Sequence, residues 1–166
     1  MTPEEQIKKF KDKYGVRLRK TLEVVTKMAG ERTMDMVILR TKAGFGSNGS
    51  ELKELSPKYK EFRDRYRSLL DDSTDPDTSN LTATGQLLEA LYLRIVGTRF
   101  FIKVNSKKHK NILSGGKKKK KSSSESSVTN DQIRGYQEEQ GREFLRLSDD
   151  EKKELEQFVR DELQSM

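Results

Sequence analysis

The sequence contains no cysteine, and its one histidine, His109, stands among lysines. Without cysteine, disulfides and thiolate metal sites are excluded, and folding in a reducing compartment is allowed. His109 has no carboxylate nearby in the sequence, so it supports neither a metal site nor a catalytic base. No pair of carboxylates stands in an apolar setting that would tune it for acid–base chemistry. We therefore expect a protein that is not an enzyme and that holds no cofactor or metal.

Long apolar runs are missing as well. No stretch of about 18 apolar residues occurs, which predicts no membrane-spanning helix, and the start MTPEEQIKKF lacks the apolar segment of a secretion signal. Hydrophobic residues make up 31% of the chain and charged residues 37%, a polar balance for a globular protein. We expect one domain over residues 1–166, built from thin amphipathic elements, with an assembly supplying part of the burial.

Acidic residues are absent from one basic segment. The chain has 34 Lys and Arg against 27 Asp and Glu, a net charge of +7, but residues 107–121 hold eight lysines and no acid, so the remainder is close to neutral. Residues 105–127 are rich in Lys, Ser and Gly and predict a flexible insertion. This insertion either contacts phosphates or an acidic protein surface, or is only a soluble loop. The candidate contact residues are Lys107, Lys108, Lys110, Lys117, Lys118, Lys119, Lys120 and Lys121.

Residues 81–104 carry the clearest structural signals. Thr84 is positioned to cap a short helix, after which the apolar period changes to two, which is typical of a strand. Gly97 fits the first central position of a type II′ turn between two strands. A hairpin of two strands is marginally stable alone, so helices must cover one face of it. The residues expected on the covered face are Leu91, Leu93, Ile95, Phe100, Ile102 and Val104.

The N-terminal third predicts helices. Thr2, Pro3 and Glu5 form a capping box with Pro at the first helical position. An apolar stripe with helical spacing follows, and the helix is expected to end near Gly30. Residues 33–40 are short and apolar and fit a second helix or a buried strand; we favour a helix. The stripe consists of Ile7, Phe10, Tyr14, Leu18, Leu22 and Val25.

Two loops and one further helix follow. Residues 43–50 are Gly-rich but lack the Gly-Lys-Ser/Thr of a phosphate-binding loop. Ser56-Pro57 begins a helix whose aromatic face we expect in the core, with Arg63, Arg65 and Arg67 on its solvated face. Residues 71–80 form an acidic turn region without the spacing of an EF-hand calcium loop. The aromatic face consists of Tyr59, Phe62, Tyr66 and Leu69.

The C-terminal part predicts two more helices. One starts at Thr129, carries Ile133 and Tyr136 and is closed by Gly141. Ser148 and the acids after it form the capping box of a final amphipathic helix. The expected fold is α+β: a long N-terminal amphipathic helix and further helices packed around a small antiparallel sheet that contains a central β-hairpin.

The order of several motifs resembles the phage virion morphogenesis family, the tail-completion or neck proteins that join a filled phage head to its tail. The chain matches ELKELSPKYKEFR (51–63), a Leu-x-x-Thr-Gly-x-Leu pattern, a hairpin, a Tyr-containing segment ending in Gln-Gly, and an Arg-x-Phe-Leu-x-Leu-Ser run. The resemblance covers the chain from about residue 44 onward. The matching residues include Leu81, Thr84, Gly85, Leu87, Tyr136, Gln140, Gly141, Arg142, Phe144 and Leu145.

The resemblance implies a structural virion protein that forms an oligomeric ring, a hexamer, in the neck of a tailed phage. The implied neighbours are the head–tail connector and the tail tube or tail terminator, with non-specific contact to genomic DNA in the channel. The implied location is the virion, with assembly in the host cytoplasm and no membrane. The alternative from another class is a non-specific nucleic-acid-binding protein that acts through the Lys-rich loop.

Overall fold

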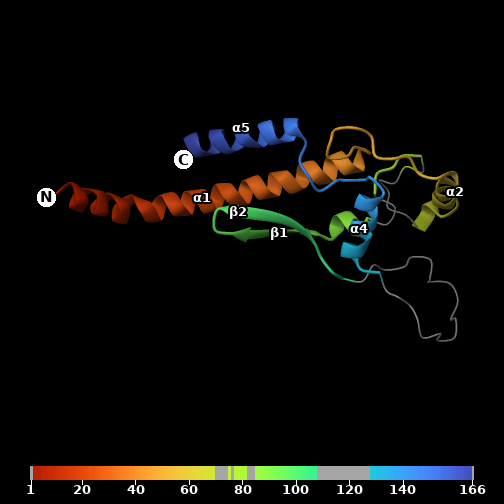
Figure 1. Cartoon of the computed structure of the whole chain (residues 1–166), viewed down its shortest axis with the longest axis horizontal. Helices are drawn as coiled ribbons and strands as arrows, with labels where there is room; N and C mark the ends of the chain where they lie inside the picture. The colour runs from red at the N-terminus through yellow and green to blue at the C-terminus, as the bar shows by residue number, and fades with distance from the viewer. Residues whose placement is uncertain (1, 70–74, 76, 82–84, 108–127, 166) are drawn as a thin grey trace.

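The computed structural model describes residues 2–69, 75, 77–81, 85–107 and 128–165. It confirms an α+β fold with a long N-terminal helix, further helices and a two-stranded antiparallel sheet (Figure 1). The elements in chain order are α1 (Pro3–Lys42), α2 (Pro57–Arg65), the 3-10 helix η1 (Arg67–Leu69), α3 (Gln86–Glu89), β1 (Leu91–Val96), β2 (Arg99–Val104), α4 (Asn130–Glu139) and α5 (Asp149–Ser165).

Helix α1 begins as its sequence predicts. The Thr2 side chain accepts a hydrogen bond from the Glu5 backbone N–H, and the Glu5 carboxylate accepts one from the Thr2 backbone N–H. The expected end near Gly30 is wrong, because α1 continues to Lys42 and includes residues 33–40. Gly30 serves packing instead: a Cβ built there would lie 2.7 Å from a methyl group of Leu93. The small residue lets the hairpin approach the helix closely.

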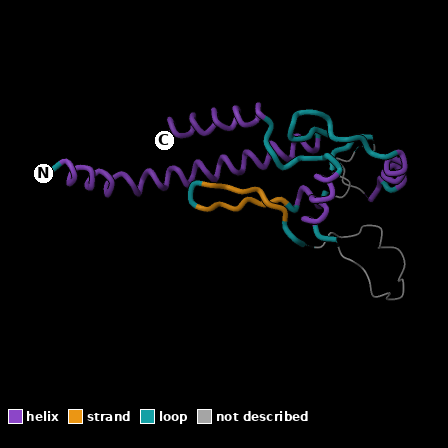
Figure 2. The backbone as a smooth tube through the Cα atoms, viewed as in Figure 1, coloured by secondary structure: helices purple, strands orange, loops and turns teal. Residues whose placement is uncertain are grey.

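Helix α1 lies between two layers. The hairpin packs on one side of it and α5 on another, so that α1 separates them along its C-terminal half (Figure 2). Arg40 of α1 joins these parts, because its guanidinium donates to the Glu151 carboxylate of α5 and to the backbone carbonyls of Phe144 and Arg146. This side chain fixes both the segment before α5 and the first turn of α5 against α1.

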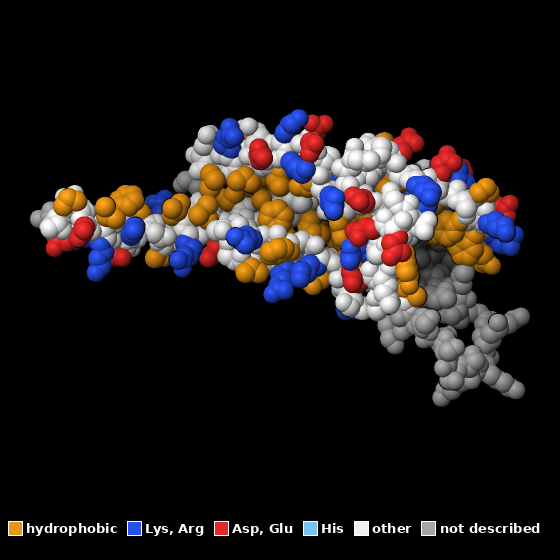
Figure 3. Space-filling view, in the orientation of Figure 1, with side chains coloured by type: hydrophobic (Ala, Val, Ile, Leu, Met, Phe, Trp, Pro, Cys, Tyr) orange, Lys and Arg blue, Asp and Glu red, His pale blue; other side chains and the backbone are white. Residues whose placement is uncertain are grey.

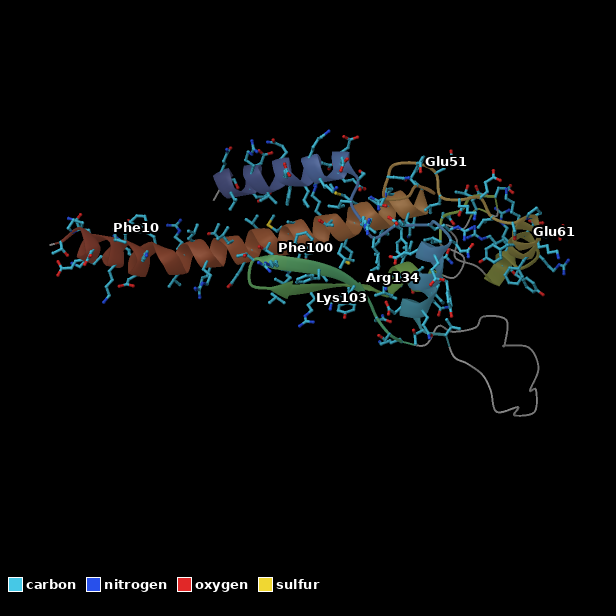
Figure 4. All side chains as sticks on the ribbon, in the orientation of Figure 1. Phe10, Glu51, Glu61, Phe100, Lys103 and Arg134 are labelled. Atoms are coloured by element: carbon cyan, nitrogen blue, oxygen red, sulfur yellow. The ribbon has the colours of Figure 1, made fainter. Side chains whose placement is uncertain are left out.

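The hairpin has the predicted register. Leu91, Leu93 and Ile95 of β1 pair with Val104, Ile102 and Phe100 of β2, so these six side chains share one face. Gly97 has a φ of 61° and Thr98 does not have a positive φ, as a type II′ turn requires. Figure 4 shows Phe100 on the side of the hairpin that meets α1 and Lys103 on the opposite side. The prediction that a helix covers this face is therefore confirmed.

The core is small and lies near the C-terminal end of α1. Val37, Leu87, Leu88, Leu91 and Phe144 form its fully buried part. The half-buried side chains packed around it come from α1, the hairpin, α4 and the segment before α5. Stretches that lie far apart in the sequence, Leu81 among them, thus meet at one cluster.

The later helices begin at capping residues as well, and the predicted roles of Gly141 and Ser148 are confirmed. Thr129 and Gln132 form a capping box at α4, and Gly141 follows that helix with a φ of 77°. Ser148 and Glu151 exchange the same pair of hydrogen bonds at the start of α5. The residue before α3 is Gly85, while Thr84, its predicted cap, lies outside the described residues.

Candidate assembly surfaces

The first half of α1 is uncovered. Every residue from position 2 to position 20 is exposed, whereas burial begins in the next turn and is complete at Val25 and Ala29. We call residues 3–20 the α1 overhang; at 1.5 Å per residue it is roughly 27 Å long. Figure 1 shows it projecting beyond both the hairpin and α5.

The apolar stripe predicted from the sequence lies on this overhang. Its side chains remain largely accessible: Ile7 is 55% exposed, Phe10 65%, Tyr14 43% and Leu18 59%. Phe10 and Tyr14 contact each other, with ring centroids 4.7 Å apart. Figure 3 shows apolar side chains that run along the seam between α1 and α5 and out onto the overhang. Exposed apolar stripes occur at sites of interaction with proteins or membranes and in ligand-binding grooves.

The hairpin has a second uncovered face. Side chains of a strand alternate between its two faces, so the side turned away from α1 carries the residues between those that pack on the helix. We call this side the outer hairpin face. It contains no acid, and its apolar members Tyr92, Val96 and Phe101 are 44%, 53% and 46% exposed. Its members are Tyr92, Arg94, Val96, Arg99, Phe101 and Lys103.

Helix α2 contains an unexpected buried cation. Arg63, predicted on the solvated face, is 1% exposed, and this part of the prediction is wrong. Its guanidinium donates to the carbonyl oxygens of Asp75 and Thr78 at 2.9 and 2.7 Å and stands 5.4 Å from the Tyr59 ring. The sequence does hold a signal: Arg63 is four residues after Tyr59 and three before Tyr66, so it shares their helix face.

Arg63 fastens the turn that carries its hydrogen-bond acceptors. The Asp75 carboxylate accepts from the Asp77 backbone N–H and from the Thr78 hydroxyl. These hydrogen bonds hold the pKa of Asp75 below its ordinary value of 3.8, and the charges of Arg63 and Arg67 add to the shift. The turn therefore depends on both a buried cation and an ionised carboxylate.

A groove of about 700 Å³ lies between α2, α4 and the segment after α1. Arg142 lines it and ties the segment after α1 in place, because its guanidinium donates to the backbone carbonyls of Lys53 and Glu54 and to the Gln137 side chain. Burial lowers the pKa of Arg142, and the charge of Arg63 acts in the same direction. Both arginines thus hold backbone segments together around this groove.

The residues that carry the family resemblance lie in several parts of the structure. Leu87 and Phe144 are buried in the core, and Leu81 and Leu145 pack against it half-buried. Gln140 and Arg142 line the groove together with Leu81 and Leu87. Tyr136 is 54% exposed. Gly85 and Gly141 take positive φ values of 67° and 77°, and Thr84 lies outside the described residues.

Of the eight lysines named as candidates for contact with phosphates or an acidic protein surface, the structure describes Lys107. It is exposed, its backbone N–H donates to the Asn105 side chain, and its carbonyl accepts from the Asn130 backbone N–H. These bonds join the end of the hairpin to the start of α4. The other seven, Lys108, Lys110 and Lys117 to Lys121, lie outside the described residues.

The residues that the structure describes carry neither a candidate metal-binding cluster nor a helix fit to cross a membrane. Among those residues no group of three or more His, Cys, Asp or Glu side chains could hold a metal ion. No helix within the described ranges is long and apolar enough to cross a membrane. What the described surface offers is two uncovered faces, the α1 overhang and the outer hairpin face.

No protein-family model, curated protein or solved structure matches this chain. A functional proposal therefore rests on the motifs in the sequence and on the surfaces described above.

Proposed function

We propose that this chain is a structural assembly protein of a tailed phage. In this proposal copies of the chain form a ring, a hexamer, that joins the head connector to the tail tube or tail terminator. It works without catalysis, in the virion, after assembly in the host cytoplasm. The motif order that resembles the phage virion morphogenesis family supports this proposal.

The single observation that carries the proposal is the uncovered overhang of α1. In proteins most of the stability of a helix comes from tertiary packing of its apolar face. The four large apolar side chains of the overhang remain largely exposed, so their burial against a partner would be favourable. Binding of a partner to the folded chain stabilises it by mass action. A helix that remains uncovered in one chain and covered in an assembly fits a structural protein better than a monomeric enzyme.

The second candidate function is non-specific nucleic-acid binding. It rests on the eight lysines and absence of acid in residues 107–121. Lysines neutralise phosphates without reading sequence, so such binding falls steeply as salt rises. In a neck ring the same lysines would contact genomic DNA in the channel, so DNA binding is expected for both candidate functions. Assembly into an oligomer is expected only for the first, and it therefore distinguishes them.

Light scattering on the purified full chain at two salt concentrations tests the proposal. A matched variant replaces the eight lysines of the loop with serine, which removes the charge and keeps the loop length. We expect a defined oligomer for both proteins, alone or after head connector and tail components are added. A strict monomer that ignores these components yet binds duplex DNA through the lysines would replace the proposal with its alternative.

A further inference from the structure

The overhang and the outer hairpin face lie at the same end of the molecule, yet one chain cannot bring them together. The overhang belongs to a continuous helix that extends past the turn of the hairpin (Figure 1). The outer hairpin face points away from that helix, because the inner face is packed on it. Any contact between these two surfaces therefore joins two copies.

We propose that the α1 overhang of one copy packs on the outer hairpin face of a second copy. This inference rests on the proposed assembly function and names the two surfaces that meet. The hairpin would then lie between two helices, its own α1 on the inner face and the second copy's overhang on the outer face. Each surface supplies the cover that the other lacks in a single chain.

The dimensions of the two surfaces agree. The overhang is roughly 27 Å long, and the strands, with six residues each, are about 20 Å long. The apolar side chains of both surfaces together still expose roughly 700 Å². A little over half of an interface is apolar, so this corresponds to about 1,200 Å² in total, the lower end of the range for a stable pairwise interface. One such contact is therefore modest. A closed arrangement, in which every copy uses both surfaces, gains from the high effective concentration of the last contact.

Contact between an overhang and the hairpin of a second copy explains more of the exposed surface than contact between two overhangs does. Pairing of two overhangs would leave Tyr92, Val96 and Phe101 uncovered, whereas one overhang–hairpin contact covers both surfaces. The two surfaces are different, so the contact is heterologous and repeats around a ring or along a filament. Overhang pairing would stop at a two-fold dimer.

The charges on the two surfaces predict how the contact depends on salt. The overhang carries seven basic and three acidic residues, and the outer hairpin face carries three basic residues and no acid. Like charges oppose the contact at low salt, and screening reduces this repulsion within a Debye length of about 10 Å at 0.1 M. Association through these surfaces therefore strengthens as salt rises, whereas binding of phosphates by lysine weakens.

The absence of cysteine makes disulfide cross-linking a direct test. Lys11 is exposed and lies four residues after Ile7 and three before Tyr14, on the face of the stripe. Arg94 lies on the outer hairpin face opposite Phe101. The full-length variants Lys11→Cys and Arg94→Cys are mixed and oxidised. The matched control pairs Arg94→Cys with Val16→Cys, since Val16 is 62% exposed on the opposite face of the same helix segment.

We expect the Lys11–Arg94 mixture to give at least about tenfold more heterodimer than the Val16 control. The two thiols held in one complex react at an effective concentration near millimolar, whereas the thiols of the control meet only by diffusion. The yield should rise between 0.05 and roughly 0.5 M salt. Equal yields in both mixtures, or a Lys11→Cys product that is mainly its own homodimer, would overturn the inference. If the wild-type chain forms a fixed oligomer without the Lys11–Arg94 product, the docking is wrong while the assembly function stands. If the wild-type chain instead remains monomeric, even with head connector and tail components added, both the docking and the assembly function are wrong.

Discussion

The close approach of α1 and the hairpin at Gly30 gives a quantitative prediction. A Cβ at this position would lie 2.7 and 2.9 Å from the two methyl groups of Leu93 and 3.2 Å from the Phe100 ring. The substitution Gly30→Leu places four carbons in this space. Overpacking costs about 1–3 kcal/mol, and replacing Gly by Leu in a helix returns roughly 0.8 kcal/mol. The difference predicts a fall in the free energy of unfolding of roughly 0.2–2.2 kcal/mol, towards the upper end because four carbons are added.

The matched control is Gly15→Leu in the same helix, where a Cβ meets nothing within 4 Å. This variant should be at least as stable as the wild-type chain, because only the gain in helix propensity of up to about 1 kcal/mol applies. Urea unfolding followed by circular dichroism at low protein concentration measures both free energies, and amide hydrogen exchange measures protection of the hairpin. A Gly30→Leu variant as stable as the wild type, with unchanged protection in β1 and β2, would refute the packing argument.

Two further substitutions and one change of pH test the contacts of Phe144, Arg63 and Asp75. Phe144→Ala removes a fully buried ring and should cost about 3–5 kcal/mol, seen as a fall in Tm of roughly 10 °C for a chain of this size; a fall under about 2 °C would contradict its place in the core. Arg63→Met leaves the carbonyls of Asp75 and Thr78 without their donor and should cost about 1–3 kcal/mol, with faster amide exchange at Thr78; unchanged exchange would show that Arg63 does not hold this turn. The lowered pKa of Asp75 means that its contribution to stability is complete above pH about 4 and is lost as the pH falls further, through the folded pKa; NMR shifts at Thr78 that begin to change above pH 5 would contradict it.

The sequence predicted the strands and helix caps, because each is determined by residues that lie close together in the chain. The two strands followed from the change of apolar period at Leu91 and the turn at Gly97, and the Thr2 and Ser148 caps followed from residue types at fixed spacing. In these cases the atoms that determine the structure are close together in the chain. A short window of sequence therefore contains the information.

The end of α1 could not be predicted in this way. Glycine closes a helix when it is exposed at a C-terminus, and it admits a neighbour when it is packed in the middle. Gly30 is packed in the middle of α1, where it admits the side chain of Leu93. Because Leu93 lies far along the chain, the sequence around Gly30 does not reveal this contact. Arg63 was missed for a related reason, because its acceptors belong to a turn twelve and fifteen residues away.

The apolar stripe of α1 shows a third limit. Its spacing predicted one amphipathic face from Ile7 to Val25, and the helix carries that face as expected. The sequence pattern contains no information on what covers it, and in the single chain Val25 is buried while Phe10 is 65% exposed. The same pattern therefore describes part of a core and part of an exposed surface.

In the proposed function, copies of this chain assemble into a closed ring. Native mass spectrometry of the full chain at rising concentration, with head connector and tail components added in parallel samples, detects such a ring by its mass. A closed ring predicts one dominant species of fixed copy number with few intermediates, since closure gives each copy both of its contacts. A monomer under every condition, or an open ladder of sizes without a preferred copy number, would contradict it.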